Sequence, residues 1–578
     1  MISRRHIVVG LVTAAAILLV GRVMAVVYTD YAWYRALGAT ALWKERVRDI
    51  ATIHVGSAIA AGGFALLNLS AIRRSIVSLS FPRRIGNVEF GEAVPRRYLD
   101  RFALLLATAI AGVMSIVAPR WQQLALVRTG VEFGERDPFF QMDLGFYTAW
   151  LPLEHAVYMW FLILLVVVMV VVTGLYALTP SLRWQKNAFY TSVHVRRHLA
   201  VLGAMLLLAM AWSYRLHGYE LLIEGSGSAG AFSYIDHQWL IPAYLSLSVG
   251  TVAAAALVLA SGWTGQVRAS FFTVSAVLVF SVAFDLVLPF VVRRFGRSAA
   301  ESNEAPYEAT RRIFTRRAYG LPAAPPLASP REITRFAAFS DSLRTAATIN
   351  RARANALVYP GATGIALIGD GAAVQAPALG KGLLRLAHSW SEQRLDLAWN
   401  ALPETTKIVR TRDVRERISA LMPVFAQGSE LTPAYIADTL FWVAELYSAS
   451  STYPLSRHYR LAGEERSYLR HMGTALVNSR TGRVKVVPVA SPDPISAAWR
   501  MRFPGVFRAG IPDILDELRP TPSERRATGR PAAIAGGDSV FRAEVSRLYA
   551  RMRGALAAGD LKAFGDAYDS LGTVIGRE

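Results

Sequence analysis

The sequence predicts an α-helical membrane bundle of seven transmembrane helices, followed by an α+β extracytoplasmic domain and a C-terminal helical hairpin. Two observations lead to this fold class. Apolar stretches long enough to cross a bilayer fill residues 1–292 of the 578-residue chain, and the residues after them are polar-rich. A hydrocarbon core of about 30 Å needs roughly 20 apolar residues, and in lipid only helices and closed barrels satisfy their backbone hydrogen bonds.

Seven spans follow from the apolar runs. They are residues 7–28, 51–72, 102–118, 156–178, 199–213, 241–263 and 271–292. The fifth is the shortest, so we expect it either to extend to His217 by snorkelling or to lie in a thinner patch of bilayer. The first is too long for a signal peptide, and Gly21-Arg22-Val23 is a poor cleavage site, so we interpret it as a retained helix.

Basic residues in the short loops give the orientation, because cytoplasmic loops carry the excess of Lys and Arg. The second, fourth and sixth inter-span loops are richer in arginine and lysine than the first, third and fifth. This places the N-terminus in the cytoplasm and the C-terminal domain outside the inner (cytoplasmic) membrane. Arg293, Arg294 and Arg297, which follow the last span, run against that assignment.

Composition excludes several function classes. The net charge is +21, yet only six of the 63 basic residues are lysine, and no basic face is interleaved with aromatic residues as in nucleic-acid stacking modules. Attraction of the cytoplasmic loops to anionic lipid accounts for much of the surplus. The chain has no cysteine, which excludes disulfides, thiol catalysis and cysteine-ligated metals.

The second half divides into three predicted parts. Residues 293–519 form the α+β domain, with helices at 331–354 and 412–422 and strands at 439–446 and 483–489. Residues 478–482 have the composition of a hairpin turn. Residues 520–537 are rich in Pro, Arg, Ala and Gly and are typical of a flexible linker, and residues 538–578 form a helical hairpin around Gly559-Asp560.

Several ordered segments resemble uncharacterised protein family 0182, a group of bacterial multi-pass membrane proteins. They are residues 30–38 (DYAWYRALG), 137–140 (DPFF), 143–147 (DLGFY), 306–307 (PY), 315–321 (TRRAYGL), 412–417 (RDVRER), 440–443 (LFWV), 453–454 (YP), 467–470 (SYLR), 493–495 (DPI), 498–500 (AWR) and 503–507 (FPGVF). The resemblance implies seven spans and a large extracytoplasmic domain, and it implies no activity or catalytic residue. It also implies that family members continue well beyond residue 507, so this chain is expected to be a shortened member.

Motifs for common chemistries are absent from the sequence. There is no His-Glu-x-x-His helix, no Gly-x-Ser-x-Gly elbow and no phosphate-binding loop. Residues 364–371 come nearest to such a loop, but Asp370 stands where lysine is needed, which favours a tight turn. No catalytic motif is recognisable and no cofactor is expected, which favours a non-enzymatic role.

Two sets of residues are candidate sites. Arg22 lies deep in the first span and Asp285 deep in the last, and such charges are costly in lipid unless they are paired. We expect these two to form an intramembrane charge pair, which acts as a structural clamp or, alternatively, lines an ion path. The second set gathers imidazoles and carboxylates at span ends, where they either bind a divalent metal or form ordinary interfacial hydrogen bonds: Glu154, His155, His217, Glu220, Asp236 and His237.

The leading hypothesis is an envelope-associated scaffold or binding protein whose partners are the lipid bilayer and envelope polymer or envelope proteins. One alternative is a transporter or channel that uses Arg22 and Asp285. The other is a membrane-tethered enzyme acting on envelope polymer or lipid, with Asp370, Asp438 or Asp493 converging in a cleft. An outer cleft with paired carboxylates favours the enzyme, and a polar tunnel through the spans favours transport.

Overall fold

The computed structural model describes most of the first 507 residues. The described ranges are 4–76, 84–85, 88–89, 96–177, 182–185, 188–227, 230–287, 291, 303–321, 356–369, 373–436, 439–461 and 464–507, with isolated positions between 547 and 570. The chain divides into two compact units, the first comprising residues 1–334 and 345–510 and the second residues 335–344 and 511–578. The later part of the first unit, residues 303–507, is called the C-terminal domain.

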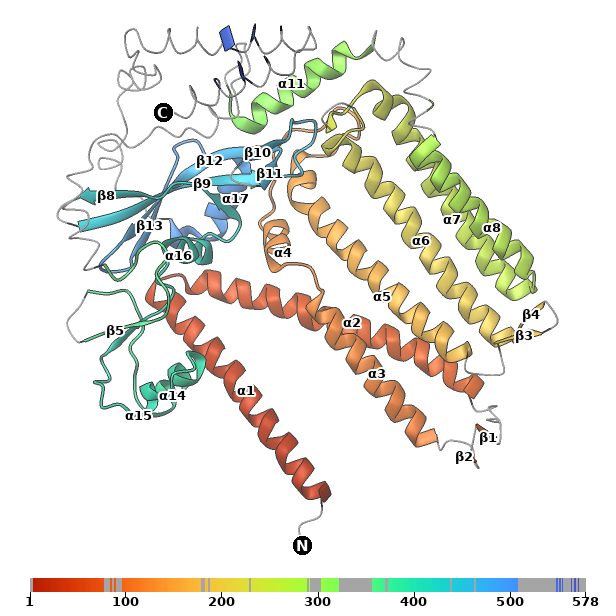
Figure 1. Ribbon diagram of the computed structural model, residues 1–578, viewed down its shortest axis with the longest axis horizontal. Coiled ribbons are helices and arrows are strands. Elements are labelled where there is room, and N and C mark those ends of the chain that lie inside the picture. Colours follow the sequence, from red (N-terminus) through yellow and green to blue (C-terminus); the bar gives the residue numbers. More distant parts are fainter. Residues whose placement is uncertain are drawn as a thin grey trace. The chain divides into compact units, whose positions relative to one another are not determined.

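Long apolar helices make up the N-terminal half (Figure 1). They are α1 (Arg4–Ala36), α2 (Thr40–Ile76), α3 (Arg96–Ile116), α5 (Leu151–Ala177), α6 (Val193–Ile223) and α7 (Ile241–Thr264), with the shorter α4 (Trp121–Arg128) and α8 (Val267–Val282). Six described helices are long and apolar enough to cross a membrane, and they correspond to the first six predicted spans. The predicted seventh is represented by α8, a shorter apolar helix, so a count of seven stays a prediction.

Helix α6 is longer than the predicted fifth span, and both snorkelling and a thinner patch of bilayer stay predictions. It begins at Val193, where Ser192 caps the helix, and runs past His217 to Ile223. Two π-helical turns, η1 (Phe146–Trp150) and η3 (Asp236–Leu240), lead directly into α5 and α7 and lengthen those helices. A third, η4 (Ala283–Val287), follows α8.

Small residues let the helices approach closely, as is common where both helices contact lipid. Helices α6, α7 and α8 share a buried cluster composed of Ala204, Leu207, Ala254, Ala255, Val258 and Val277. A Cβ added at Gly262 of α7 would lie only 2.4 Å from the Ala200 Cβ of α6, so this crossing depends on glycine. His198 joins three helices, because its ring nitrogens hydrogen-bond Tyr176 of α5 at 2.8 Å and Asn68 of α2 at 2.9 Å.

The C-terminal domain is built on one antiparallel sheet. Its strand order is β13 (Val484–Pro488), β12 (Tyr468–Asn478), β9 (Thr439–Ser450) and β7 (Phe425–Gln427), and β8 (Thr432–Ile436) also pairs with β9. The long central pair runs from Tyr468 opposite Ser450 to Asn478 opposite Phe441, with a register shift between His471 and Gly473. Helix α17 (Pro494–Arg502) contributes Trp499, which is fully buried.

Shorter elements surround this sheet. They are the helices α11 (Ala305–Tyr319), α14 (Gly382–Ser391), α15 (Asp396–Trp399) and α16 (Val414–Leu421), the 3-10 turn η5 (Pro504–Val506), and the strand pairs β5 (Ala366–Ile368) with β6 (Lys407–Val409) and β10 (Tyr459–Leu461) with β11 (Glu464–Arg466). Between the apolar helices, β1 (Arg84–Ile85) pairs with β2 (Val88–Glu89), and β3 (Leu182–Gln185) with β4 (Ala188–Thr191).

Local predictions for this domain hold where the structure describes them. The helix expected at 412–422 is α16, the strands expected at 439–446 and 483–489 are β9 and β13, and the turn at 478–482 joins β12 to β13. The helix expected at 331–354 and the linker at 520–537 lie outside the described residues, as does most of the hairpin at 538–578. The domain boundaries proposed from the sequence stay predictions.

Candidate functional site

Arg417 joins the C-terminal domain to α1, because its guanidinium lies over the Trp33 ring near the end of that helix. It lies on α16, whose first turn is capped by the Asp413 carboxylate. That carboxylate accepts hydrogen bonds from the backbone N–H groups of Arg415 and Glu416, at 2.8 and 3.0 Å. The cap sets where the helix begins, and one turn later the Arg417 side chain points inward and is 0% exposed.

Backbone carbonyls hold the Arg417 guanidinium. It donates to the carbonyl oxygens of Gly482 at 2.8 Å, Thr411 at 2.9 Å and Arg410 at 3.2 Å. Its Cζ also lies 5.5 Å from the centre of the Trp33 ring in α1, within range of a cation–π contact. Burial lowers the pKa of Arg417 to about 10, so the group stays charged at neutral pH. In the part of the chain that the structure describes, no carboxylate pairs with it.

Gly482 shapes the hairpin turn around this guanidinium. Its φ is +68°, a left-handed conformation that glycine adopts without strain. A Cβ at this position would lie 2.8 Å from an Arg417 Nη atom. The predicted hairpin turn therefore also provides the space and the carbonyl that Arg417 needs.

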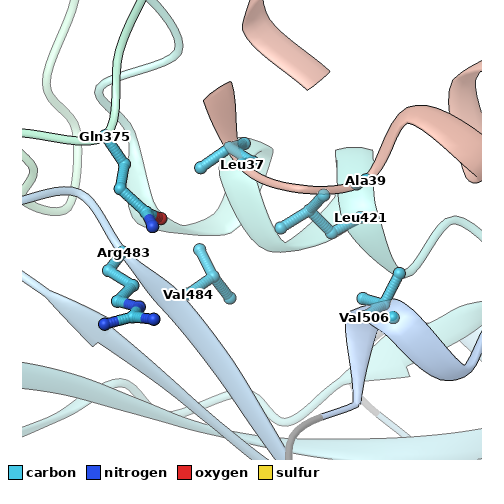
Figure 2. Close-up of a pocket in the computed structure, with 8 residues that line it drawn as sticks. Leu37, Ala39, Gln375, Leu421, Arg483, Val484 and Val506 are labelled. Atoms are coloured by element: carbon cyan, nitrogen blue, oxygen red, sulfur yellow. The ribbon is translucent and has the colours of Figure 1, made fainter. Parts of the chain in front are cut away.

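A small hollow adjoins this contact (Figure 2). Its lining comes from the α1–α2 turn, the loop before α14, α16, the start of β13 and η5: Leu37, Ala39, Gln375, Leu421, Arg483, Val484, Gly505 and Val506. It has room for about one water molecule. We interpret it as a packing gap between the turn and the domain, since it is too small for a substrate.

Helix α14 makes a second contact with α1 at the predicted site residue Arg22. The Arg22 guanidinium donates to the Trp390 carbonyl at 2.8 Å, and the Thr29 and Ser391 hydroxyls are 2.9 Å apart. The Asp285 side chain lies outside the described residues, so the Arg22–Asp285 pair stays a prediction. The observed partner shows that Arg22 serves to hold the C-terminal domain against α1.

His388 is sealed into the same contact. It is 0% exposed, its ring meets Tyr28 edge-on at 5.9 Å, and neither ring nitrogen has a hydrogen-bond partner among the described residues. Burial, with a smaller contribution from the Arg410 charge, lowers the pKa of His388 to about 4. The imidazole is therefore neutral at physiological pH and packs as an apolar ring.

Other span ends also contact the domain. The Tyr34 hydroxyl of α1 donates to the Ala420 carbonyl at 2.8 Å, and the Leu455 N–H donates to the Leu222 carbonyl of α6 at 2.6 Å. Between α3 and α5, Glu135 pairs with Arg317 of α11 at 2.8 Å. We call this set of contacts, together with those of Arg22 and Arg417, the anchor.

The histidines and acids predicted as a possible metal site separate into two groups. His155 Nδ1 lies 2.7 Å from Glu220, and His217 Nε2 lies 3.9 Å from the same carboxylate. Asp236 instead accepts hydrogen bonds inside its own loop, including one from the Ser233 N–H at 2.8 Å.

His237 of the second group hydrogen-bonds the Tyr307 hydroxyl at 2.8 Å. Glu154 pairs with Arg215 and accepts a hydrogen bond from the Trp212 indole at 2.9 Å. Among the described residues, no group of three such side chains is arranged to hold a metal ion. Metal binding at these positions stays a prediction.

Comparison with known proteins identifies the family of this chain. The model of an uncharacterised protein family (UPF0182) matches residues 7–353 and 373–519. The chain belongs to this family. UPF0182 proteins similar to it come from Moorella thermoacetica, 31% identical over 51% of this chain and 33% of the relative, and Desulforamulus reducens, 26% identical over 54% and 36%.

A relative in Nocardia farcinica is 22% identical over 90% of this chain and 68% of its own length. This UPF0182 chain spans about a third of the length of the first relatives it matches. No solved structure matches it. The family therefore supports the predicted resemblance and adds no activity.

The structure describes one of the three acidic residues that the sequence suggested for an enzyme's active site. Asp493 of this UPF0182 chain is buried, caps α17 and accepts hydrogen bonds from the Ser448 hydroxyl at 2.8 Å and the Tyr468 hydroxyl at 3.1 Å. Asp370 and Asp438 lie outside the described residues, so their convergence with Asp493 stays a prediction. Satisfied by three donors, Asp493 links the sheet to α17.

Sequence reasoning missed two polar groups in the domain. Glu445 of β9, 9% exposed, lies 2.5 Å from His471 Nε2 and accepts a hydrogen bond from the Thr474 hydroxyl at 2.9 Å. These residues face one another only because β9 and β12 pair in that register. Arg417 was missed too, although its signal was present: an arginine among the apolar positions Val414, Ile418 and Leu421 of one helix face.

Proposed function

We propose that this UPF0182 chain is an envelope-associated scaffold or binding protein of the cytoplasmic membrane, with its C-terminal domain on the extracytoplasmic side. The observation that carries the proposal is where the anchor touches the apolar helices. The domain contacts Tyr34 beyond the first span, Glu135 between the third and fourth, and Leu222 at the end of the fifth. These positions belong to the three inter-span segments that the charge rule assigns to the outside.

The anchor also favours a structural role over transport. In a transporter, Arg22 would line a water-filled path together with Asp285. Its guanidinium instead donates to the Trp390 carbonyl of the C-terminal domain. A charge used this way holds the domain on its membrane support, as a scaffold requires.

Single cysteines test the orientation, because the chain has no cysteine of its own. Arg480→Cys lies in the exposed hairpin turn of the domain, and Arg268→Cys lies at the exposed start of α8. We expect a membrane-impermeant maleimide to label position 480 in intact spheroplasts and position 268 only after permeabilisation. The opposite labelling pattern would reverse the proposed topology.

Photocrosslinking then tests the binding role. With a photoreactive maleimide at position 480, we expect crosslinks to envelope proteins or envelope polymer in whole cells, and none at position 268. If the orientation is as proposed and position 480 still gives no envelope adduct, the scaffold or binding role is wrong.

A further inference from the structure

Helix α14 has its polar and apolar faces reversed relative to a helix of a water-soluble domain. His388 and Ser389 are both fully buried, whereas Leu383 is 83% exposed and Leu386 is 45% exposed. At 100° per residue, Leu383, Leu386 and Trp390 share one face and His388 and Ser389 lie away from it. A helix on the surface of a soluble domain buries the apolar face and exposes the polar one.

Helix α15 extends the exposed apolar surface. Leu395 is 60% exposed and Trp399 is 79% exposed, while Leu397 between them is fully buried in the domain. A contiguous exposed apolar surface usually marks a binding site for a protein or a membrane. We call Leu383, Leu384, Leu386, Leu395 and Trp399 the apolar patch.

The contacts between α14 and α1 indicate which environment the apolar patch faces. Figure 1 shows α14 beside α1, and three contacts join them: Arg22 with Trp390, Tyr28 with His388 and Thr29 with Ser391. These α1 positions cover about 10 Å of helix at 1.5 Å per residue. Counting about 20 residues of bilayer from Ile7, where the apolar run of α1 begins, places the far edge of the hydrocarbon core near Val26. Helix α14 thus lies at the level where α1 leaves the lipid.

Charge around the patch is balanced. Residues 381–404 contain three basic residues (Lys381, Arg385, Arg394) and three acidic residues (Glu392, Asp396, Glu404), a net charge of zero. Lys381 pairs with Glu404, and Arg394 with Asp396 at 2.5 Å. Attachment of this segment would therefore depend on apolar burial and not on anionic lipid.

We propose that α14 and α15 bind the membrane interface, with the apolar patch entering the boundary between headgroups and acyl chains beside α1. The occupant is the lipid bilayer, because α14 packs against α1 at Arg22, and Leu19, about one turn earlier on the same helix, is 67% exposed. Trp399 provides the amphipathic ring common at this depth. The inference rests on the proposed function, since it needs the domain to lie against the membrane.

Nitroxide labels on single cysteines measure this directly in the full chain reconstituted in phosphatidylcholine liposomes. The two test positions are Leu383→Cys and Trp399→Cys, both highly exposed, so that labelling leaves the packing intact. Leu19→Cys is the control for lipid contact and Arg480→Cys the control for water. At each position, collision with oxygen reports lipid and collision with a water-soluble nickel chelate reports water.

We expect positions 383 and 399 to lose collision with the chelate and gain collision with oxygen, as at position 19. The same result in liposomes with and without anionic lipid is expected from the balanced charge. Chelate access at both positions equal to that at position 480 would overturn the proposal. Protection from both reagents would also overturn it, because a protein or a second copy of the chain would then cover the patch. If position 19 itself fails to report lipid, the membrane location fails instead.

Discussion

Replacing Arg417 by methionine should destabilise the protein by removing part of the anchor. The change leaves the buried carbonyl of Gly482 unpaired, which costs about 1–3 kcal/mol, and the half-buried carbonyls of Thr411 and Arg410, which cost about 1 kcal/mol each. Loss of the Trp33 contact adds about 1 kcal/mol. Relief from burying a charge, whose pKa burial lowers to about 10, returns about 3 kcal/mol. We expect a net loss of roughly 1–3 kcal/mol.

The assay is the midpoint of thermal unfolding of the full chain in detergent, followed by size-exclusion chromatography after heating. The expected fall in Tm is roughly 2–10 °C. Arg480→Met is the matched control, because it makes the same chemical change at an exposed position. Arg417→Lys should melt nearly as low as Arg417→Met, since an ammonium group cannot reach carbonyls on three sides. A Tm for Arg417→Met equal to that of Arg480→Met would refute the reasoning.

Three further predictions concern neighbouring residues. The pKa of His388 falls from 6.5 to about 4 on folding, so between these pH values the unfolded chain binds a proton that the native chain does not. The free energy of unfolding should therefore decline by at most roughly 3 kcal/mol as the pH drops from about 6.5 to 4. The variant His388→Leu should remove this dependence of Tm on pH. Gly482→Ala should cost about 1–3 kcal/mol from its left-handed φ and the clash with Arg417, and an unchanged Tm would mean that the turn relaxes. Arg22→Leu should lower the expression of folded protein. If Arg22 pairs with Asp285, adding Asp285→Leu should restore that expression. A double variant that expresses no better than either single variant would contradict the pairing.

Hydropathy predicted where helices contact lipid but not how far they continue beyond it. The second apolar run begins at residue 51, yet α2 begins at Thr40, because a helix continues through polar residues when the C-terminal domain packs against that end. Arg46 of α2 donates to the Tyr34 hydroxyl at 2.9 Å, and a hydropathy average cannot predict such a side-chain contact. The π-helical turns before α5 and α7 likewise have no sequence signal that we could use.

The anchor was harder to predict because its acceptors are backbone carbonyls. The cost of a charge in the first span correctly indicated that Arg22 needs a partner. The partner found is the carbonyl of Trp390, and any residue type at that position would supply the same group. Helical periodicity placed Arg417 on a helix. The carbonyls that bind it come from loop and turn positions, where the residue type does not indicate which side chain the carbonyl binds.

The anchor also sets an order of events during biosynthesis. Tyr34 and its acceptor Ala420 are 386 positions apart, so the first span and its aromatic end leave the ribosome long before the residues that cover them. At about 5–20 residues per second, that delay lasts roughly 20–80 s. Throughout it, Trp33, Tyr34 and Leu37 must wait at the membrane surface without their native neighbours. Nascent chains stopped before residue 420 would therefore lack the Ala420 carbonyl that accepts the hydrogen bond from Tyr34.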